Sequence, residues 1–263
     1  MPHQMFKQIE EDISIRDQTL NWILIKPKVE SFPSENEEIL PGLKWGHYGK
    51  LYTPAFWKVQ YLLSSQHQKN FSHKLCNTLV EEIVMCILGG YGIPSEMGVT
   101  AFKKLQEEKL IKSNITFEKL YRVLASPFKV KNDKYVRYRF YNQKAKYVHS
   151  FLNRVDLKTI SQLNDLELRE WLLTVQGIGL KTASWITRNW LHSNRVAILD
   201  IHVLRAGKLT GFFENLNISN YRILEKKYLE FCDAIKVNAA DMDAIIWGYM
   251  KKNNKLNSKI LYS

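Results

Sequence analysis

The sequence is poor in cysteine. Its 263 residues include only three, Cys76, Cys86 and Cys232, and no two of them form a C-x-x-C pair. A zinc knuckle is therefore not expected, and three thiols cannot supply the four ligands of an iron–sulfur cluster. Because two of the three fall within apolar helical patterns, we expect these to pack as small hydrophobic side chains.

Long hydrophobic segments are also missing. No run of roughly 18 apolar residues is present, and the first seven residues lack the charged-then-apolar pattern of a secretion signal. No internal repeat or low-complexity segment stands out. These absences favour a soluble, intracellular protein without a membrane partner.

Basic residues, in contrast, are abundant. Lys and Arg total 38 against 26 Asp and Glu, which gives a net charge of +12 and a pI near 9.4. Each Lys or Arg that faces a phosphate releases condensed counterions, so this excess favours a polyanionic partner. No polybasic block adjoins an amphipathic anchor, which favours nucleic acid over a membrane surface.

The chain divides by pattern at about residue 50. Residues 1–50 are irregular and interrupted by Pro27, Pro33 and Pro41, although 20–25 has weak strand character. We interpret them as an extension that packs onto a main body at 51–263 and contributes a short β-ribbon. With 45% hydrophobic residues, the chain can form one large core or two small domains that share a cleft.

From Thr53 onward the pattern is helical. Leu75, Leu79, Ile83 and Ile87 recur every four residues, which predicts a helix between a cap at Ser72 and a stop at Gly89-Gly90. We expect further helices at 95–112, 116–125, 135–154, 164–175, 180–191, 200–210, 219–235 and 240–251. The fold class is therefore mostly α, with two helical subdomains flanking a cleft.

The most informative segment is a predicted helical hairpin at 164–191. Asn164 and Glu167 form a capping-box pattern, and Gly177-Ile178-Gly179 separates two helices. The glycines permit positive φ and leave room above the turn, while the N-terminus of the second helix suits a phosphate. An ordinary helical hairpin with a glycine cap explains this turn equally well. The basic charge favours a hairpin that binds DNA.

A lysine and an aspartate follow this turn. Lys181 lies in the first turn of the second helix, where the dipole disfavours a cation. Together with partial burial, the dipole would favour the neutral amine that a nucleophile requires. Asp200 begins the next helix, and a plain N-cap explains it without any further role.

These residues resemble a known signature. Gly177-Ile-Gly-Leu-Lys181, followed nineteen residues later by Asp200-Ile-His202, is similar to the helix-hairpin-helix and Asp motif of the DNA glycosylase superfamily. The surrounding residues resemble those of the bacterial and archaeal 8-oxoguanine glycosylase/lyases. Two other stretches, 82–88 and 138–147, agree with this resemblance, which covers about residues 70 to 250.

The resemblance implies a bifunctional enzyme that flips an oxidised purine, 8-oxoguanine, out of double-stranded DNA. We expect the protein to be a monomer. Lys181 would attack C1′, form a Schiff base and nick the strand by β-elimination. Asp200 would stabilise the cationic sugar, and His202 would contact a phosphate together with the hairpin glycines.

No cofactor is required for this chemistry. By analogy with the family, a monovalent cation, Na⁺ or K⁺, would bind the backbone carbonyls of Leu173, Val175 and Ile178.

The resemblance also implies a base pocket. Asp243 and Trp247 lie four residues apart on one helix face, where Trp247 would stack on the extruded purine and Asp243 would accept hydrogen bonds from its edge. Alternatively, Trp247 lies in the core and Asp243 is solvated. Trp185, one turn after Lys181, would form another wall, where the family usually carries a smaller residue.

One part of the family pattern is missing. The small polar segment expected after residue 88 reads Gly89-Gly-Tyr91-Gly-Ile-Pro. The candidates for wedging the duplex and reading the opposite base are therefore Tyr91, Gln143 and Lys144.

Two alternative functions stay open. The first is a glycosylase/lyase for an oxidised pyrimidine, of the endonuclease III kind, which usually carries an iron–sulfur cluster. The second is a non-catalytic hairpin module that only grips DNA, which would not need a lysine and an aspartate at this spacing.

Overall fold

The chain folds into two compact units. The computed structural model describes residues 21–65, 74–90, 92–129, 135–214 and 220–253. Unit 1 joins Met1–Phe71 to Leu199–Ser263, and unit 2 is Ser72–Ile198. The boundary expected near residue 50 therefore lies inside unit 1, which the chain leaves and re-enters. The described residues are mostly helical, as predicted, and none of their helices has the length and apolar character needed to cross a bilayer.

Unit 1 is built around buried aromatic side chains. After a helix at 21–30, it contains α2, α9, α10, α11 and a ribbon: β1 Glu38–Leu40, β2 Leu43–Lys44, α2 Pro54–Ser65, α9 Ile201–Thr210, α10 Tyr221–Ala234 and α11 Ala239–Lys252. Helix α11 packs against α2 and α9. The indole N–H of Trp57, a fully buried residue, donates to the Thr210 hydroxyl at 2.7 Å.

The N-terminal segment of unit 1 contains the ribbon that the sequence predicts. β1 and β2 are antiparallel, with Glu38 opposite Lys44 and Leu40 opposite Leu43. The strand suggested at 20–25 is wrong for the described residues, because they begin a helix. Ile25 and Val29, one turn apart, are buried against α2, and this burial favours a helix over a strand.

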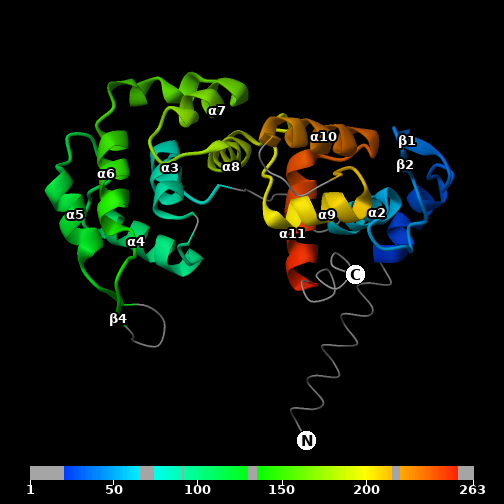
Figure 1. Cartoon of the computed structure of the whole chain (residues 1–263), viewed down its shortest axis with the longest axis horizontal. Helices are drawn as coiled ribbons and strands as arrows, with labels where there is room; N and C mark the ends of the chain where they lie inside the picture. Colours follow the sequence, from blue (N-terminus) through cyan, green and yellow to red (C-terminus); the bar gives the residue numbers. More distant parts are fainter. Residues whose placement is uncertain (1–20, 66–73, 91, 130–134, 215–219, 254–263) are drawn as a thin grey trace, which may run out of the picture. The chain divides into compact units, whose positions relative to one another are not determined.

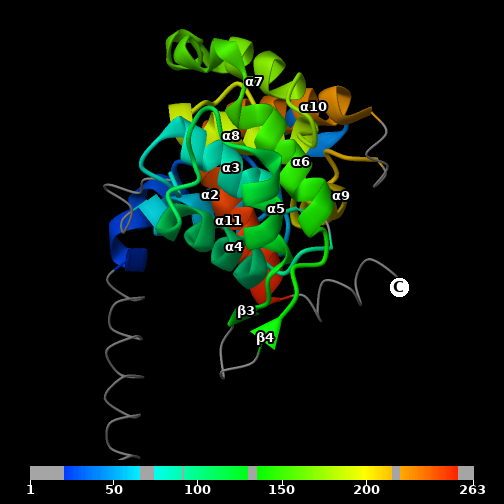
Figure 2. The ribbon, with the colours of Figure 1, turned by 90° about the vertical axis from the view of Figure 1, so that its left-hand side faces the viewer.

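In unit 2, the other helices surround α3 (Figures 1 and 2). Its elements are α3 Leu79–Leu88, α4 Ser95–Glu107, α5 Phe117–Ala125, β3 Phe128–Lys129, β4 Tyr135–Val136, α6 Tyr141–Leu152, η2 Val155–Lys158, η3 Ile160–Gln162, α7 Asp165–Leu173 and α8 Leu180–Leu191. Helix α3 contacts α4, α6 and α8. The core contains Ile83, Ile87 and Phe151, all essentially inaccessible to solvent.

Two predicted helices of unit 2 start later than expected. The cap of α3 is Thr78, which exchanges hydrogen bonds with Glu81 in a capping box, and the expected cap, Ser72, lies outside the described residues. Leu75 therefore lies outside the helix. The helix predicted from residue 135 begins at Tyr141, because Tyr135–Val136 pairs with Phe128–Lys129 as a second ribbon. In both views this ribbon projects from the helices of unit 2 (Figures 1 and 2).

Polar contacts close both ends of the α7–α8 hairpin. The predicted capping box of Asn164 and Glu167 is present. At the open end, the Asp165 carboxylate accepts hydrogen bonds from the Ser193 hydroxyl at 2.6 Å and from the Arg195 guanidinium. The hydrogen bond from Arg195, supported by the one from Ser193, lowers the pKa of Asp165 to about 2.

At the turn end of the hairpin, the Arg154 guanidinium pairs with Asp156 and donates to the Thr174 hydroxyl at 3.0 Å. The Trp171 indole N–H also donates to Asp156, at 2.7 Å. These contacts therefore hold the end of α7 in place next to the turn.

The low pKa of Asp165 gives a pH prediction. Its unfolded-state pKa is about 3.9, so the ion pair stabilises the fold above about pH 4 and loses this effect as the pH falls towards 2. The melting temperature of Asp165→Asn should therefore lie below that of the wild type by a constant margin from pH 7 to 5. The margin should shrink below about pH 4. Circular dichroism melts at stepped pH measure this.

The control is Glu118→Gln, which removes an exposed acid elsewhere in unit 2. A margin for Asp165→Asn that stays constant down to pH 2 would mean that the Arg195 pair does not stabilise the hairpin.

Candidate active site

The hairpin turn contains one glycine that the fold requires and one that it does not. Gly177 has φ +88°, and a Cβ on it would lie 2.3 Å from the ring of Tyr147. Gly179, the N-cap of α8, has φ −101°, and no heavy atom lies within 4 Å of the position its Cβ would take. Between them Ile178 is buried. The space over Gly179 is therefore open to a ligand.

Lys181 follows this open glycine in the first turn of α8. The backbone N–H groups of such a turn have no partner within the helix, so they and the lysine present positive charge together. The side chain is exposed, so the partial burial expected from the sequence is wrong. Its amine is accessible to an incoming substrate.

Two side chains of α6, Gln143 and Lys144, differ in their exposure and in their hydrogen bonds. Gln143 is exposed and donates to the Tyr147 hydroxyl at 2.8 Å, beside the ring that covers Gly177. Lys144 donates to the backbone carbonyls of Ile87 and Gly89 at 2.6 and 2.9 Å, and burial lowers its pKa. Gln143 thus faces solvent next to the hairpin, whereas the ammonium of Lys144 caps α3.

The third wedge candidate, Tyr91, lies outside the described residues.

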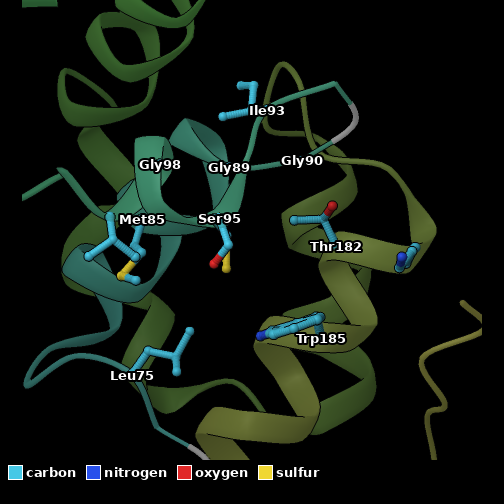
Figure 3. Close-up of a pocket in the computed structure, with 12 residues that line it drawn as sticks. Leu75, Met85, Gly89, Gly90, Ile93, Ser95, Gly98, Thr182 and Trp185 are labelled. Atoms are coloured by element: carbon cyan, nitrogen blue, oxygen red, sulfur yellow. The ribbon is translucent and has the colours of Figure 1, made fainter. Parts of the chain in front are cut away.

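A pocket of about 560 Å³ lies within unit 2 beside these elements (Figure 3). It is lined by α8 residues Lys181, Thr182 and Trp185, by the ends of α3 and α4, and by Leu75. Figure 3 shows Trp185 extending from α8 across the pocket, with its nitrogen-bearing edge towards the side of Leu75. Lys181 and Trp185, which lie on one face of α8, therefore line the same cavity.

Asp200 belongs to unit 1 and caps α9. Its Oδ1 accepts from the backbone N–H groups of His202 and Val203 at 2.8 and 2.9 Å. Among the described residues, Oδ2 has no hydrogen-bond partner. The capping interpretation is therefore correct for one oxygen, and the other oxygen remains available for chemistry.

On α11, the burial of Trp247 and Asp243 is the reverse of what the core interpretation predicts. Trp247 is 43% exposed, whereas Asp243 is only 5% exposed. His202 meets Trp247 edge-on, with ring centroids 6.4 Å apart, and Lys251 places its ammonium 4.3 Å from the Trp247 ring centroid. Trp247 thus offers a ring to solvent in the same unit as Asp200 and His202.

Sequence reasoning missed two of these contacts. The position of Tyr147 over Gly177 joins residues 30 apart in the chain, and no local pattern reports it. Lys251 follows Trp247 by four residues within one helix, and this spacing could have predicted their contact.

A family model described as 8-oxoguanine DNA glycosylase matches residues 63–243. An 8-oxoguanine DNA glycosylase/AP lyase of Metallosphaera sedula is 31% identical over 121 residues, which are 43% of this chain and 58% of that protein. One of Fusobacterium nucleatum is 31% identical over 122 residues, or 41% of this chain and 56% of that protein. The chain therefore spans little more than half the length of these relatives.

Two solved structures share the fold. The 8-oxoguanine DNA glycosylase of Thermotoga maritima has a TM-score of 0.50 and 21% identity, over 92% of this chain and 97% of that one. The Methanocaldococcus jannaschii 8-oxoguanine glycosylase/lyase, in complex with 15mer DNA containing 8-oxoguanine, has a TM-score of 0.50 and 22% identity, over 76% of this chain and 89% of that one. At these identities the similarity concerns the fold alone.

The two hairpin glycines give a stability prediction. Gly177→Ala introduces a Cβ at positive φ against the Tyr147 ring, so it should lower the free energy of unfolding by about 1–3 kcal/mol. Gly179→Ala, which meets no atom, should leave it unchanged within about 0.5 kcal/mol. Urea unfolding of both variants measures the difference. Equal losses would mean that Gly179 is also required by the fold.

Proposed function

Because the chain belongs to the 8-oxoguanine DNA glycosylase family, we propose that it is a bifunctional glycosylase and AP lyase. Its substrate is an oxidised purine, 8-oxoguanine, in double-stranded DNA. The observation that carries this proposal is the position of Lys181: an exposed amine in the first turn of α8, next to an open glycine and on the rim of a pocket that holds Trp185.

Lys181 is the nucleophile of the proposed reaction. Its neutral amine forms a bond to C1′ of the extruded nucleotide while the bond from C1′ to the base breaks, and the base leaves with a proton. Opening of the sugar gives a Schiff base between Lys181 and C1′. Loss of a C2′ proton then expels the 3′ phosphate by β-elimination.

Asp200 stabilises the positive charge that develops on the sugar. Two backbone N–H groups hold its Oδ1, so the direction of the carboxylate is set before substrate arrives. Oδ2 is the oxygen left for the sugar cation and for the proton of the lysine. Preorganised charge of this kind contributes strongly to catalysis.

The grip on DNA comes from backbone and side chains together. The open N-terminus of α8, at Gly179, suits a phosphate because unpaired N–H groups and the helix dipole both favour an anion. The exposed Gln143 lies beside the same hairpin, and His202 contacts a further phosphate. The net charge of +12 supports a polyanionic partner.

The extruded base is held by aromatic side chains. The exposed ring of Trp247 provides a stacking face, and the buried Asp243 accepts hydrogen bonds from the base edge. Trp185 of the α8 pocket is a further wall. Stacking on such rings contributes about 1–3 kcal/mol per base.

We also propose that the hairpin holds Na⁺ or K⁺ on the carbonyls of Leu173, Val175 and Ile178. The Val175 carbonyl accepts one hydrogen bond, from Ile178 N–H at 3.1 Å, and its second lone pair can still bind a cation. The cation would neutralise phosphate charge at the turn. No other cofactor takes part, and the protein acts as an intracellular monomer.

The test of the function is covalent trapping with borohydride on duplexes that carry 8-oxoguanine, an oxidised pyrimidine or no lesion. Wild-type protein should form an adduct with the 8-oxoguanine duplex, and Lys181→Gln should form none while binding the duplex with less than about tenfold weaker affinity. The reason is that one charge among many contributes little to DNA affinity.

Lys104→Gln is the matched control, because Lys104 lies on α4 and pairs with Glu107 and Glu108. It should trap like the wild type. Trapping by Lys181→Gln would move the nucleophile elsewhere. Trapping on the pyrimidine lesion alone would favour the endonuclease III kind of activity, and duplex binding without any adduct would favour a non-catalytic DNA-binding module.

A pair of substitutions separates the two roles of Asp200. Asp200→Asn keeps a capping oxygen but removes the charge, so excision should fall by at least 100-fold at unchanged stability. Asp200→Ala should lose excision equally and also about 1 kcal/mol of stability. Single-turnover excision and urea unfolding measure the two effects. Normal excision by Asp200→Asn would leave Asp200 as a cap only.

A further inference from the structure

The α8 pocket has one wall that is fixed by side chains from α6 and the segment before it. Lys144 holds the carbonyl of Gly89, and the Tyr138 hydroxyl donates to the carbonyl of Leu88, the last residue of α3. Gly98 of α4 lies so close that a Cβ on it would be 3.3 Å from the Gly89 Cα. This wall is therefore closely packed and held in place by side-chain hydrogen bonds.

The side of the pocket at Leu75 is fixed by a buried acid. Oε2 of Glu82, which is inaccessible to solvent, accepts hydrogen bonds from the backbone N–H groups of Leu75 and Cys76 at 2.9 and 3.0 Å. These bonds hold the segment before α3 against the helix. The pocket is consequently preformed, which favours binding because little ordering cost remains.

Trp185 contributes a polar atom that nothing in the described part of the chain satisfies. Its Nε1 is buried and donates to no acceptor. The indole N–H groups of Trp57 and Trp171 each donate to a side-chain oxygen at 2.7 Å. Trp45 also lacks an acceptor, but it does not line this pocket. A buried donor without an acceptor is costly, so an acceptor that reaches this edge of Trp185 would be favoured.

The other lining residues indicate the chemistry of the ligand. Met85, Ile93 and Val99 are apolar, and the pocket volume of about 560 Å³ falls in the range of small-molecule sites. An indole N–H only donates, so the ligand must present an acceptor. A flat heteroaromatic ring with a carbonyl oxygen fits both conditions. Lys181 lies on the rim of the same pocket, so a base in the pocket would be attached to the sugar that the amine attacks.

We infer that the indole N–H of Trp185 donates a hydrogen bond to a carbonyl oxygen of the extruded base, so that Trp185 helps to select the lesion. This inference rests on the proposed function, since it takes the ligand of the pocket to be the base. It assigns to Trp185 a recognition role beyond that of a wall. An oxidised purine such as 8-oxoguanine carries two carbonyl oxygens.

The first test is Trp185→Phe, which keeps an aromatic ring and removes the N–H. Single-turnover excision of 8-oxoguanine should fall about tenfold, as expected for the loss of one hydrogen bond. Cleavage of a ready-made abasic site, which has no base, should be unchanged. Trp190→Phe is the matched control: Trp190 lies on the same helix, where the Lys74 ammonium is 4.2 Å from its ring centroid, and both rates should stay at wild-type values.

Stability separates recognition from packing. In the free protein the Trp185 N–H has no bond to lose, so a variant with β-(3-benzothienyl)alanine at this position, in which sulfur replaces the N–H, should melt no lower than the wild type. It should still lose excision as Trp185→Phe does. Wild-type excision by this variant, or equal losses on the lesion and the abasic substrate, would overturn the inference.

Nuclear magnetic resonance makes the result independent of catalysis. The Trp185 indole N–H resonance is assigned by its loss in Trp185→Phe and followed in the Lys181→Gln background. It should shift on binding a duplex with 8-oxoguanine and not on binding one with a tetrahydrofuran abasic analogue. An absent shift refutes the role of Trp185 even if the wild type excises the base. A shift without excision by the wild type refutes the proposed function alone.

Discussion

The organisation of unit 2 depends on which donors form hydrogen bonds with the carbonyl groups at the C-terminal end of α3. A helix leaves its last carbonyls without partners, and a buried end must find donors for them. Here Ile87 and Leu88 are buried, so water is not the donor. Lys144 binds the carbonyls of Ile87 and Gly89, and Tyr138 binds that of Leu88. One structural requirement therefore fixes where α6 starts and where the pocket wall lies.

Helix α6 carries this constraint to the hairpin. One turn after Lys144, on the same helix, Tyr147 lies over Gly177, and only a residue without a side chain fits there. The wall of the pocket and the turn before Lys181 are consequently positioned by two neighbouring residues of one helix. A site built on a shared rigid helix is held more precisely than a site on a loop.

Local patterns in the sequence predicted the elements whose causes are local. The capping box at Asn164, the glycine turn and the helix after Asp200 are all present, because each depends on neighbours within four residues. The apolar repeat predicts a start of α3 that is too early, because Leu75 fits the four-residue spacing of the helix. The backbone N–H of Leu75 instead donates to the side chain of Glu82, which is not part of that repeat. The burial of Lys144 likewise arises from residues more than 50 positions away, which no periodicity reports.

The candidate site is distinguished by bonding capacity that the fold leaves unused. Lys144 and Lys181 are the same residue type, but the first donates to two carbonyls whereas the second is exposed beside an open helix end. Trp171 and Trp185 differ in the same way, since the first donates to a carboxylate and the second to nothing described. A buried donor without an acceptor, such as the indole N–H of Trp185, costs stability. Within each pair, the proposed function uses the member whose side chain has no acceptor in the described part of the protein.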